Sequence, residues 1–495
     1  MLLQAFLTAA LTSLSIAQTV EFELPISART SEIESDWSTV YYGKSPLLIG
    51  NDGSAGSGGF SAWDLVGETP LREVVKRTPG RTKLVTTVYD LDDKDYLVTI
   101  DAPESNLKLY DLAHLDRKEK TSKKVLGDWS ALCPWKGKAG DQYVYLFGKQ
   151  QAIQFLLRGK KGDAEIVEVQ TFDMPIEASS CAVLQDAVFV AGDDDKNVCS
   201  FTATESTSSP VIASIGEAED DVTGLASYVG KRQEDDLLFV AQKDTISVYS
   251  GKFNLLGNLK LTGDDDIEVQ GLSVFQGKIK GNNAGVLTFA VESDSGAGFG
   301  TADLDDAFSS LKLKTNTEYN PSKGPSKKDV KSPICNECND DGFCSPHSKR
   351  YLPDARCDCF AGFTGKDCKR TTCRMDCSGR GKCVGANECK CDAGWGGLYC
   401  SFLLVEPTAE TDANGGDGDD PAIWIAPGDT SKSRIVTTTK SEVGAGLGVF
   451  DLGGKLLQTI PAGEPNNVDM IYGFQAGNRT VDLAYAACRE DNTLW

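Results

Sequence analysis

The chain has 495 residues, of which 40% are hydrophobic and 50 are glycine, and its formal net charge at pH 7 is -22. This length is enough for more than one domain, each with a core of its own. The negative charge excludes nucleic acid and anionic membrane surfaces as expected partners, because both repel a polyanion.

The first segment of the chain predicts export from the cell. Residues 2–16 form an apolar run that is too short to span a membrane. Ser15-Ile16-Ala17 after it has the small-x-small form of a cleavage site. We therefore expect residues 1–17 to be a signal peptide, the protein to be secreted, and no membrane span elsewhere. The sequon at Asn478-Arg479-Thr480 is then a predicted glycosylation site.

Residues 19–317 repeat one pattern six times. Each repeat has a run of apolar and β-branched residues, a short polar turn and a second alternating run, at a spacing of roughly 45–50 residues. The six first runs begin at Leu47, Tyr96, Tyr143, Val188, Leu237 and Val286. This is the period of a four-stranded blade, so the segment predicts an all-β fold with a six-bladed β-propeller. Blades must stack around an axis, because one blade alone cannot bury its two apolar faces.

Two cysteines of the fourth repeat leave two interpretations open. Cys181 and Cys199 fall in its predicted first and last strands, where they either form a bridge across the blade or stay as buried free thiols. The pairing of Cys133 and Cys488 is not predicted. After the propeller, residues 318–332 are rich in Pro, Gly, Ser and Lys, which indicates a linker.

Twelve of the 16 cysteines lie between residues 335 and 400. They form two sets of six, and each set closes with C-x-C followed by a last cysteine after glycines. This spacing resembles a tandem pair of EGF-like modules, here at residues 333–369 and 370–401. The resemblance implies the pairs Cys335–Cys344, Cys338–Cys357, Cys359–Cys368, Cys373–Cys383, Cys377–Cys389 and Cys391–Cys400.

Two further points concern these modules. The rival interpretation of Cys335 and Cys338 is a zinc site, which is disfavoured because the chain has 2 histidines and an even number of cysteines. The acidic entry of calcium-binding EGF modules is missing ahead of Cys335 and Cys373. The modules are therefore expected to act as a rigid spacer or as a docking surface for an extracellular protein partner.

Residues 402–495 start the propeller pattern again. Arg434-Ile435-Val436-Thr437-Thr438 and Leu447-Gly448-Val449-Phe450 restate the first blade, and Val481-Asp482-Leu483-Ala484 opens a second one. About two of six blades fit into this segment, so we expect an incomplete second propeller. Because two blades cannot close a ring, we expect it to be poorly ordered or to borrow partners from the first propeller.

The restarted repeat carries the charged groups that point to chemistry. Asp417, Asp419 and Asp420 gather ahead of its first strand, and carboxylates this close together favour a hard cation such as Ca²⁺. Lys440 follows one predicted strand and Arg489 follows the equivalent strand of the next blade. Equivalent strand ends lie side by side around the axis, so the pattern predicts a calcium centre flanked by two cations that bind a phosphorylated anion.

These residues resemble the first blades of the β-propeller phytases, the calcium-dependent secreted phosphatases of inositol hexakisphosphate (phytate). The resemblance covers about ninety residues. The segments that carry it are Asp419-Asp420-Pro421-Ala422-Ile423-Trp424, Val436-Thr437-Thr438-Thr439-Lys440, Leu447-Gly448-Val449-Phe450, Asn466-Asn467-Val468-Asp469 with Tyr472 and Phe474, and Val481-Asp482-Leu483-Ala484 with Arg489.

The resemblance implies a role for each matching residue. Asp419 and Asp420 would be calcium ligands, with Glu410 as a further acidic ligand upstream, and Lys440 and Arg489 would hold substrate phosphates. Calcium would activate a water that attacks phosphate directly, without a phosphoenzyme. Ser441 stands where the family often has a second lysine, which predicts weaker phosphate binding. The family's remaining carboxylates belong to later blades, so this chain is expected to hydrolyse little or no phytate alone.

The first propeller aligns weakly with the same family and departs from it at the site. Ser35-Asp36-Trp37 stands in place of Asp-Asp-Pro, Asp52 in place of Lys440, Glu104 near the place of Arg489, and Thr223 in place of an acidic residue. These losses predict a degenerate, non-catalytic domain. Histidine-based phosphatase chemistry is excluded, because the chain has only His114 and His347.

Two functions of different classes remain from the sequence. The first is a secreted calcium-dependent phytase with a degenerate first propeller, an EGF-like spacer and a catalytic second propeller. The second is a non-catalytic extracellular binding or adhesion protein, whose propeller and modules dock partners without turnover.

Overall fold

A computed structural model of the chain describes residues 20–54, 58–66, 69–160, 162–193, 195–279, 281–323, 331–344, 357–414, 418–440, 445–490 and 492–495. The expected signal peptide at residues 1–17, residues 324–330 of the expected linker, Asp417 and Ser441 lie outside these ranges. The chain divides into two compact units, Met1–Phe402 and Leu403–Trp495. No helix in the described part of the chain is long and apolar enough to cross a membrane.

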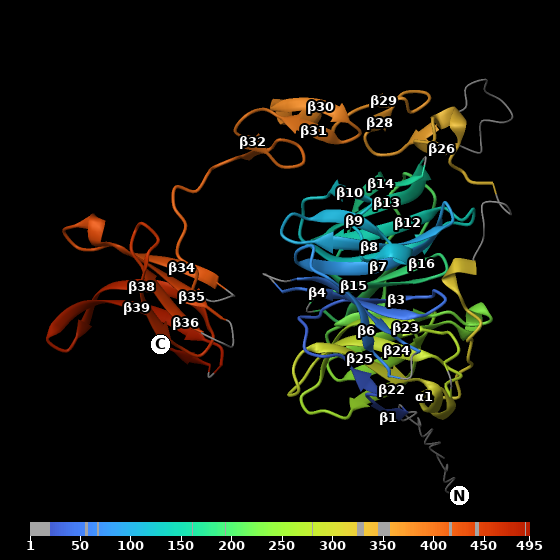
Figure 1. The fold of residues 1–495 in the computed structure, drawn as a ribbon, viewed down its shortest axis with the longest axis horizontal. Helices are drawn as coiled ribbons and strands as arrows, with labels where there is room; N and C mark the ends of the chain where they lie inside the picture. The colour runs from blue at the N-terminus through green and yellow to red at the C-terminus, as the bar shows by residue number, and fades with distance from the viewer. Residues whose placement is uncertain are drawn as a thin grey trace, which may run out of the picture. The chain divides into compact units, whose positions relative to one another are not determined.

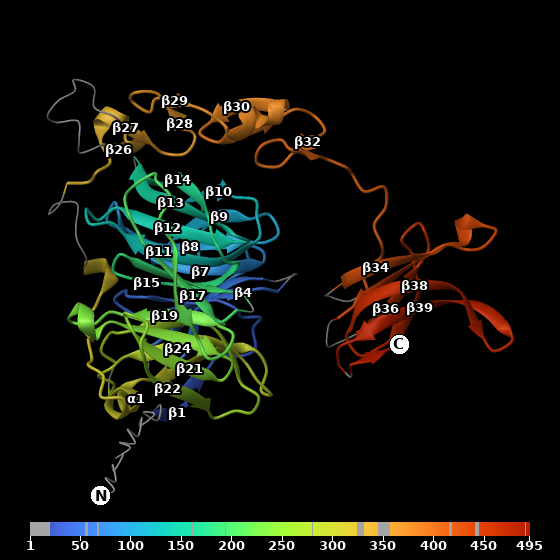
Figure 2. The same ribbon diagram turned by 180° about the vertical axis from the view of Figure 1, so that it is seen from behind.

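The first unit contains six consecutive β-sheets, which confirms the predicted propeller (Figure 1, Figure 2). Blade 1 consists of β3 (Ser38–Tyr41), β4 (Leu47–Asp52), β5 (Gly59–Asp64) and β6 (Arg72–Arg77). Blade 2 consists of β7 (Thr82–Leu91), β8 (Lys94–Asp101), β9 (Asn106–Asp111) and β10 (Thr121–Lys124). Blade 3 consists of β11 (Trp129–Lys136), β12 (Gln142–Gly148), β13 (Gln151–Lys160) and β14 (Asp163–Asp173).

The remaining blades repeat this order. Blade 4 consists of β15 (Ala178–Leu184), β16 (Ala187–Gly192), β17 (Asn197–Thr202) and β18 (Ala213–Glu217). Blade 5 contains β19 (Gly224–Tyr228), β20 (Leu237–Gln242), β21 (Thr245–Ser250) and β22 (Leu255–Thr262), and blade 6 contains β23 (Glu268–Phe275), β24 (Val286–Glu292) and β25 (Gly298–Asp303). The first strand of each blade contacts that of the next, and β23 contacts β3, so the ring is closed.

The N-terminal residues join the last blades to the first. β1 (Glu21–Pro25) pairs in parallel with β22, and β2 (Ala28–Arg29) pairs antiparallel with β25 as the outer strand of blade 6. The Arg29 guanidinium forms an ion pair with Asp264 and donates a hydrogen bond to Ser293. Hydrogen bonds from Ser293 and Ser295 lower the pKa of Asp264. Ring closure therefore depends on contacts between the two ends of the propeller sequence.

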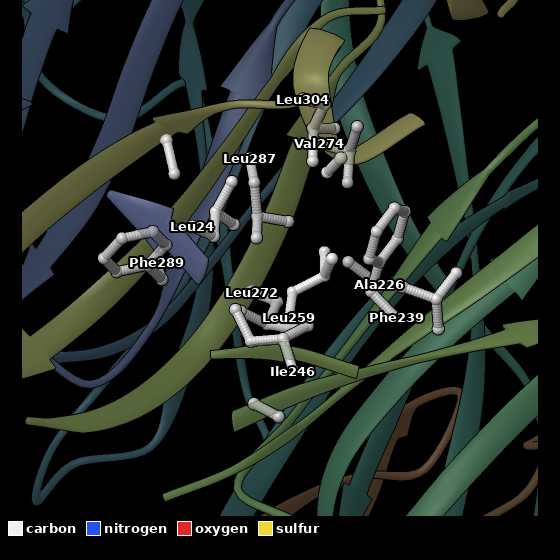
Figure 3. Packing of buried hydrophobic residues seen from close by; sticks show 14 of the residues in the cluster. Leu24, Ala226, Phe239, Ile246, Leu259, Leu272, Val274, Leu287, Phe289 and Leu304 are labelled. Carbon is white, nitrogen blue, oxygen red and sulfur yellow. The ribbon is translucent and has the colours of Figure 1, made fainter. Parts of the chain in front are cut away.

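The core of the propeller lies between neighbouring blades, as the alternating runs predict. Figure 3 shows one of the buried clusters, in which Leu24 of β1 packs with side chains of blades 5 and 6. Phe239 and Phe289 are fully buried in it. The short helix α1 (Asp305–Ser310) adds Phe308, whose ring lies 4.9 Å from that of Tyr228. Each large apolar side chain buried in this way stabilises the fold by roughly 1.5–3 kcal/mol.

Of the two interpretations left open for Cys181 and Cys199, the bridge between them is not formed, and only Cys199 is a free thiol. Val190 of β16 pairs with Cys181 on one side and with Cys199 on the other, so the two cysteines lie two strands apart. Two strand spacings put their Cα atoms about 10 Å apart, which is beyond the roughly 7 Å that a disulfide spans. Cys181 instead forms a disulfide with Cys133 of blade 3, and Cys199 is a buried free thiol.

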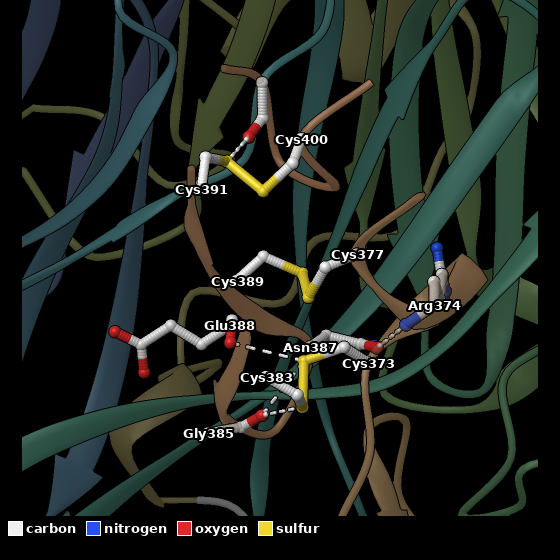
Figure 4. The surroundings of a disulfide bond; sticks show 11 residues. Cys373, Arg374, Cys377, Cys383, Gly385, Asn387, Glu388, Cys389, Cys391 and Cys400 are labelled. Carbon is white, nitrogen blue, oxygen red and sulfur yellow. Dashed lines mark hydrogen bonds between the residues drawn. A yellow bond between two sulfur atoms is a disulfide. The ribbon is translucent and has the colours of Figure 1, made fainter. Parts of the chain in front are cut away.

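The segment after the propeller is rich in disulfides. Its pairs are the ones that the EGF resemblance implies: Cys335–Cys344, Cys338–Cys357, Cys359–Cys368, Cys373–Cys383, Cys377–Cys389 and Cys391–Cys400. Figure 4 shows the last three. Its described strands form two short hairpins, β26 (Gly342–Cys344) with β27 (Cys357–Cys359) and β30 (Gly381–Gly385) with β31 (Glu388–Cys391). Two further pairs are β28 (Phe363–Thr364) with β29 (Arg370–Thr371) and β32 (Trp395–Gly396) with β33 (Phe402–Leu403).

Both halves of this segment contact blade 3 within the first unit. Phe343 and Phe360 are buried in the same apolar cluster as residues of β12 and β14. Arg158 of β13 lies 2.8 Å from Asp341. In the second half, Arg374 forms an ion pair with Glu168 of β14 and donates to Thr171. The segment is therefore packed on the propeller through both apolar and charged contacts.

One carboxyl group of blade 4 titrates near neutral pH. Burial, together with the nearby charge of Asp141, raises the pKa of Glu205 to about 7, and the Tyr143 hydroxyl donates a hydrogen bond to it. Because the folded state holds this proton at pH values where the unfolded chain has lost it, stability falls as pH rises from about 4.5 to about 7.

We expect Glu205→Gln to remove this dependence, because glutamine stays neutral. Between pH 5 and pH 8, the Tm of the native chain should fall by more than the Tm of the variant. Tm measured at both values tests this, with Glu217→Gln on exposed β18 as the control. Equal changes in Tm for the native chain and Glu205→Gln would contradict the prediction.

The second unit consists of two sheets. The first contains β34 (Gly418–Trp424), β35 (Arg434–Thr439), β36 (Gly446–Phe450) and β37 (Leu456–Pro461), and the second contains β38 (Pro465–Ala476), β39 (Arg479–Cys488) and β40 (Thr493–Leu494). The second sheet thus begins at β38, earlier than the predicted start at Val481. Ala422, Val436, Leu447, Val468 and Ala486 form a small core between the sheets.

Candidate functional site

The two adjacent carboxylates lie in a β-bulge at the start of β34. Gly418 pairs with Thr439 and Pro421 pairs with Thr437, so β34 has one residue more than β35 over this interval. A bulge bends the strand and redirects its side chains. Asp419 and Asp420 are therefore presented at the strand end rather than alternating across a regular sheet.

Asp419 forms an ion pair with Lys440, which directly follows β35. The distance from Lys440 Nζ to Asp419 Oδ2 is 3.3 Å, and the two side chains are 23% and 35% exposed. An ion pair this exposed stabilises the fold by only about 0–1 kcal/mol. Breaking it therefore costs little, and both groups are available to bind a ligand. The pair shows that the predicted carboxylate and cation lie in contact.

Asp420 connects three strands. Its backbone N–H donates to Thr438 Oγ1 at 2.9 Å, and its carboxylate accepts a hydrogen bond of 3.3 Å from the N–H of Val468 on β38. Thr438 is fully buried and also donates to the carbonyl of Asn466. These contacts hold the bulge against the first strand of the second sheet. Thr438 was not predicted as part of the site.

Arg489 directly follows β39 and is exposed. Its N–H donates to the carbonyl of Glu464 at 3.1 Å, which fixes its backbone beside the start of β38. Among the described residues, no carboxylate forms an ion pair with its guanidinium. Because β35 and β39 each run antiparallel to the strand before them, Lys440 and Arg489 lie at the same edge of the two sheets as the bulge.

The structure does not bring Glu410 to this edge, which corrects the predicted ligand set. The backbone of Glu410 lies against Gly454 in the turn between β36 and β37. The two are so close that a Cβ atom added to Gly454 would be 2.0 Å from the Glu410 carbonyl oxygen. Asp412 holds this arrangement by donating its N–H to Gly454 and accepting from Leu456. The turn is at the opposite end of the sheet from the bulge. Asn414, which was not predicted, reaches Thr439 instead.

Trp424 lies at the far end of β34 and joins the two sheets. Its indole N–H donates to Asp482 at 2.8 Å, and this hydrogen bond, with one from the N–H of Gly473, lowers the pKa of Asp482. Tyr472 accepts from the N–H of Ile425. The resemblance named Trp424, Tyr472 and Asp482, and in the structure these side chains connect strands at the end opposite the bulge.

Metal-binding capacity at the bulge is limited to two carboxylates in the described chain. The groups of three ligand-type residues close enough to share an ion consist of cysteines that are all in disulfides. No set of three carboxylates is gathered among the described residues. The oxygen donors of Asp419 and Asp420 suit Ca²⁺, which takes six to eight oxygens, so most ligands would come from elsewhere.

The corresponding end of the first propeller is built differently. Asn51 is fully buried, and its side-chain oxygen accepts from the N–H groups of Asp36 and Trp37. Asp52 is also buried and accepts from Ser54. Glu104 is exposed. Asp36 and Trp37 stand where the resemblance expects calcium ligands, and hydrogen bonds to the Asn51 side chain hold them in place.

Comparison with known proteins finds similarity in residues 400–494. Residues 400–494 match the phytase family. The chain is 42% identical over 95 residues to a 3-phytase from Bacillus subtilis (strain 168), which is 18% of this chain and 24% of that protein. It is also 40% identical over 61 residues to anterior pharynx in excess protein 1 from Caenorhabditis elegans, 12% of this chain and 10% of that protein. The chain thus spans about a quarter, or less, of the length of these relatives.

Two solved structures are similar to the chain at low sequence identity. Regucalcin, a calcium-binding protein from Agrobacterium tumefaciens, is 10% identical, with a TM-score of 0.36 over 57% of this chain and 96% of its own. The WD40 domain of SCAP from fission yeast is 13% identical, with a TM-score of 0.31 over 55% of this chain and 66% of its own.

Proposed function

We propose that the second unit, whose sequence is of the phytase type, supplies part of a calcium-dependent site that hydrolyses phosphomonoesters of phytate. The observation that carries this proposal is the edge of the second unit, where a bulge presents Asp419 and Asp420 and two strand ends carry Lys440 and Arg489. The proposed substrate has the dense negative charge that such cations bind.

The chain's own residues have distinct tasks in this proposal. Asp419 and Asp420 would hold calcium, which when bound polarises a phosphate and supplies an activated water. Lys440 leaves its exposed pair with Asp419 and contacts a phosphate as a point charge. Arg489, with no ion pair among the described residues, binds a phosphate oxygen pair with its planar fork.

The rest of the chain fits a secreted protein. The seven disulfides of the described residues form in an oxidising compartment, which supports an extracellular location. We propose that the disulfide-rich segment is a pair of EGF-like modules acting as a spacer, and that the first propeller does not catalyse hydrolysis. The alternative is a non-catalytic binding or adhesion protein, which is favoured by the small share of the chain, 18%, that matches a phytase.

A hybrid propeller tests the proposal. Residues 400–494 replace the matching segment of the Bacillus 3-phytase, and phosphate release from calcium phytate is compared with that of the native enzyme and of the 495-residue chain. We expect the hybrid to be active and the chain alone to release little phosphate. A folded hybrid that stays inert with calcium present would favour the binding protein.

A further inference from the structure

The axis of the first propeller contains an open cavity of about 370 Å³. The first strands of all six blades line it. Leu132, Val85 and Leu225 are among its apolar lining residues, and all are buried. Polar side chains such as Thr39, Thr86 and Ser273 lie between these apolar residues, and a cavity of this size with mixed walls can hold a small molecule.

Aromatic side chains lie at both ends of this cavity. Trp37 precedes β3, at the end where the first strands begin, and packs against three separate apolar clusters. Tyr319 lies at the other end, where burial raises its pKa to about 12. Asn316 holds this segment in place by donating its backbone N–H to the Tyr228 hydroxyl and its side-chain amide to Val229.

Two buried donors beside the cavity have no partner. Lys136 Nζ and Gln142 Nε2 reach neither solvent nor a hydrogen-bond acceptor among the described residues. Lys136 of β11 pairs directly with Gln142 of β12, so both side chains lie on the same face of the sheet. Both residues line the cavity.

The unpaired ammonium is the most unfavourable of these groups. Burial lowers the pKa of Lys136, and the negative charges of Asp90 and Asp95 only partly offset this by raising it. Neither carboxylate is within ion-pair distance of it in the described chain, and Asp95 accepts a hydrogen bond from Tyr41. An ammonium removed from water needs an anion close by to offset the lost hydration. The flexible four-carbon stem of lysine allows Nζ to reach a group inside the cavity.

We propose that this axial cavity binds a small organic anion that has an apolar ring system and one carboxylate or sulfonate group, with Lys136 as its counter-ion and Gln142 as a second donor. The apolar walls bury the rings, and the two unpaired donors bind the anionic group. The first propeller is then a ligand-binding domain with a site separate from the edge that carries Asp419 and Asp420.

Two fluorescent probes of similar shape test this proposal on the full chain. 8-Anilinonaphthalene-1-sulfonate carries a negative charge, and N-phenyl-1-naphthylamine is its uncharged analogue. We expect Lys136→Met, which keeps the length of the side chain, to raise the Kd of the sulfonate at least tenfold and to change that of the neutral probe less than twofold. Lys138→Met, an exposed lysine two residues away, is the matched control and should change neither Kd.

A cavity-filling variant shows where the probes bind. Ser227 of β19 lines the cavity, so Ser227→Phe should remove the binding of both probes in the cavity. Near-UV circular dichroism verifies folding of each variant. The proposal is overturned if Lys136→Met leaves the sulfonate Kd unchanged, or if a folded Ser227→Phe binds both probes as the native chain does. Should Ser227→Phe not fold, the contrast between the two probes in Lys136→Met decides alone.

Discussion

Arg489→Ala is expected to lower phosphate release by the hybrid propeller at least about a hundredfold, the usual effect of losing one charged donor at a transition state. The side chain is exposed and forms no ion pair among the described residues, so its removal leaves no buried charge behind. The backbone contact from its N–H to the carbonyl of Glu464 survives the substitution. The loss should therefore be one of phosphate binding and not of folding.

A matched control lies on the same strand. Arg479 begins β39, is exposed as Arg489 is, and lies at the other end of the strand. Arg479→Ala should retain full activity, whereas Arg489→Lys should be intermediate because it keeps the charge and loses the fork. Initial rates across a range of phytate concentrations separate KM from kcat. Equal activity of Arg489→Ala and Arg479→Ala would remove Arg489 from the proposed site.

The two carboxylates of the bulge call for different substitutions. The Asp419 carboxylate forms an ion pair with Lys440 and no hydrogen bond among the described residues, so Asp419→Asn changes charge and little else. Asp420 accepts from the N–H of Val468, so Asp420→Ala leaves that donor without its acceptor and disturbs the junction of β34 with β38. Loss of activity in Asp420→Ala therefore mixes a local structural effect with a loss of metal affinity.

The strands of the first propeller were predictable because their signal is local. The runs beginning at Leu47 and Tyr96 became β4 and β8, since alternating apolar residues fit one face of a blade. The closure by β1 was missed because Glu21 pairs with Asn258, 237 residues later, and a short parallel strand has no periodicity of its own.

The candidate site was predictable where it follows from strand ends. Lys440 and Arg489 each come directly after a strand, so the order of strands was enough to place them at one edge. Glu410 lies outside any strand, and its position depends on the contact of Asp412 with Gly454, which spacing does not reveal. Irregular segments are positioned by such individual hydrogen bonds, and for that reason the expected third ligand was misplaced.

The disulfide between blades 3 and 4 gives the second large expected effect. Cys133 and Cys181 lie on the first strands of neighbouring blades, 48 residues apart in sequence. The chain-entropy relation for a loop of this length predicts that the bond stabilises the fold by about 4 kcal/mol. The double substitution Cys133→Ala/Cys181→Ala should therefore lower the Tm of the propeller by roughly 8 °C.

Cys199→Ala is the control that separates this bond from the alternative bridge between Cys181 and Cys199. Cys199 is a buried free thiol, so its replacement removes one sulfur atom and no cross-link, and it should cost no more than about 1 kcal/mol. A bond between Cys181 and Cys199 would instead make Cys199→Ala as damaging as Cys181→Ala. Thermal unfolding without reductant measures the Tm of each variant. The cysteines of the disulfide-rich segment are unchanged in every variant, so they do not contribute to the differences. A double variant as stable as Cys199→Ala would mean that the two blades are held by their buried apolar faces alone.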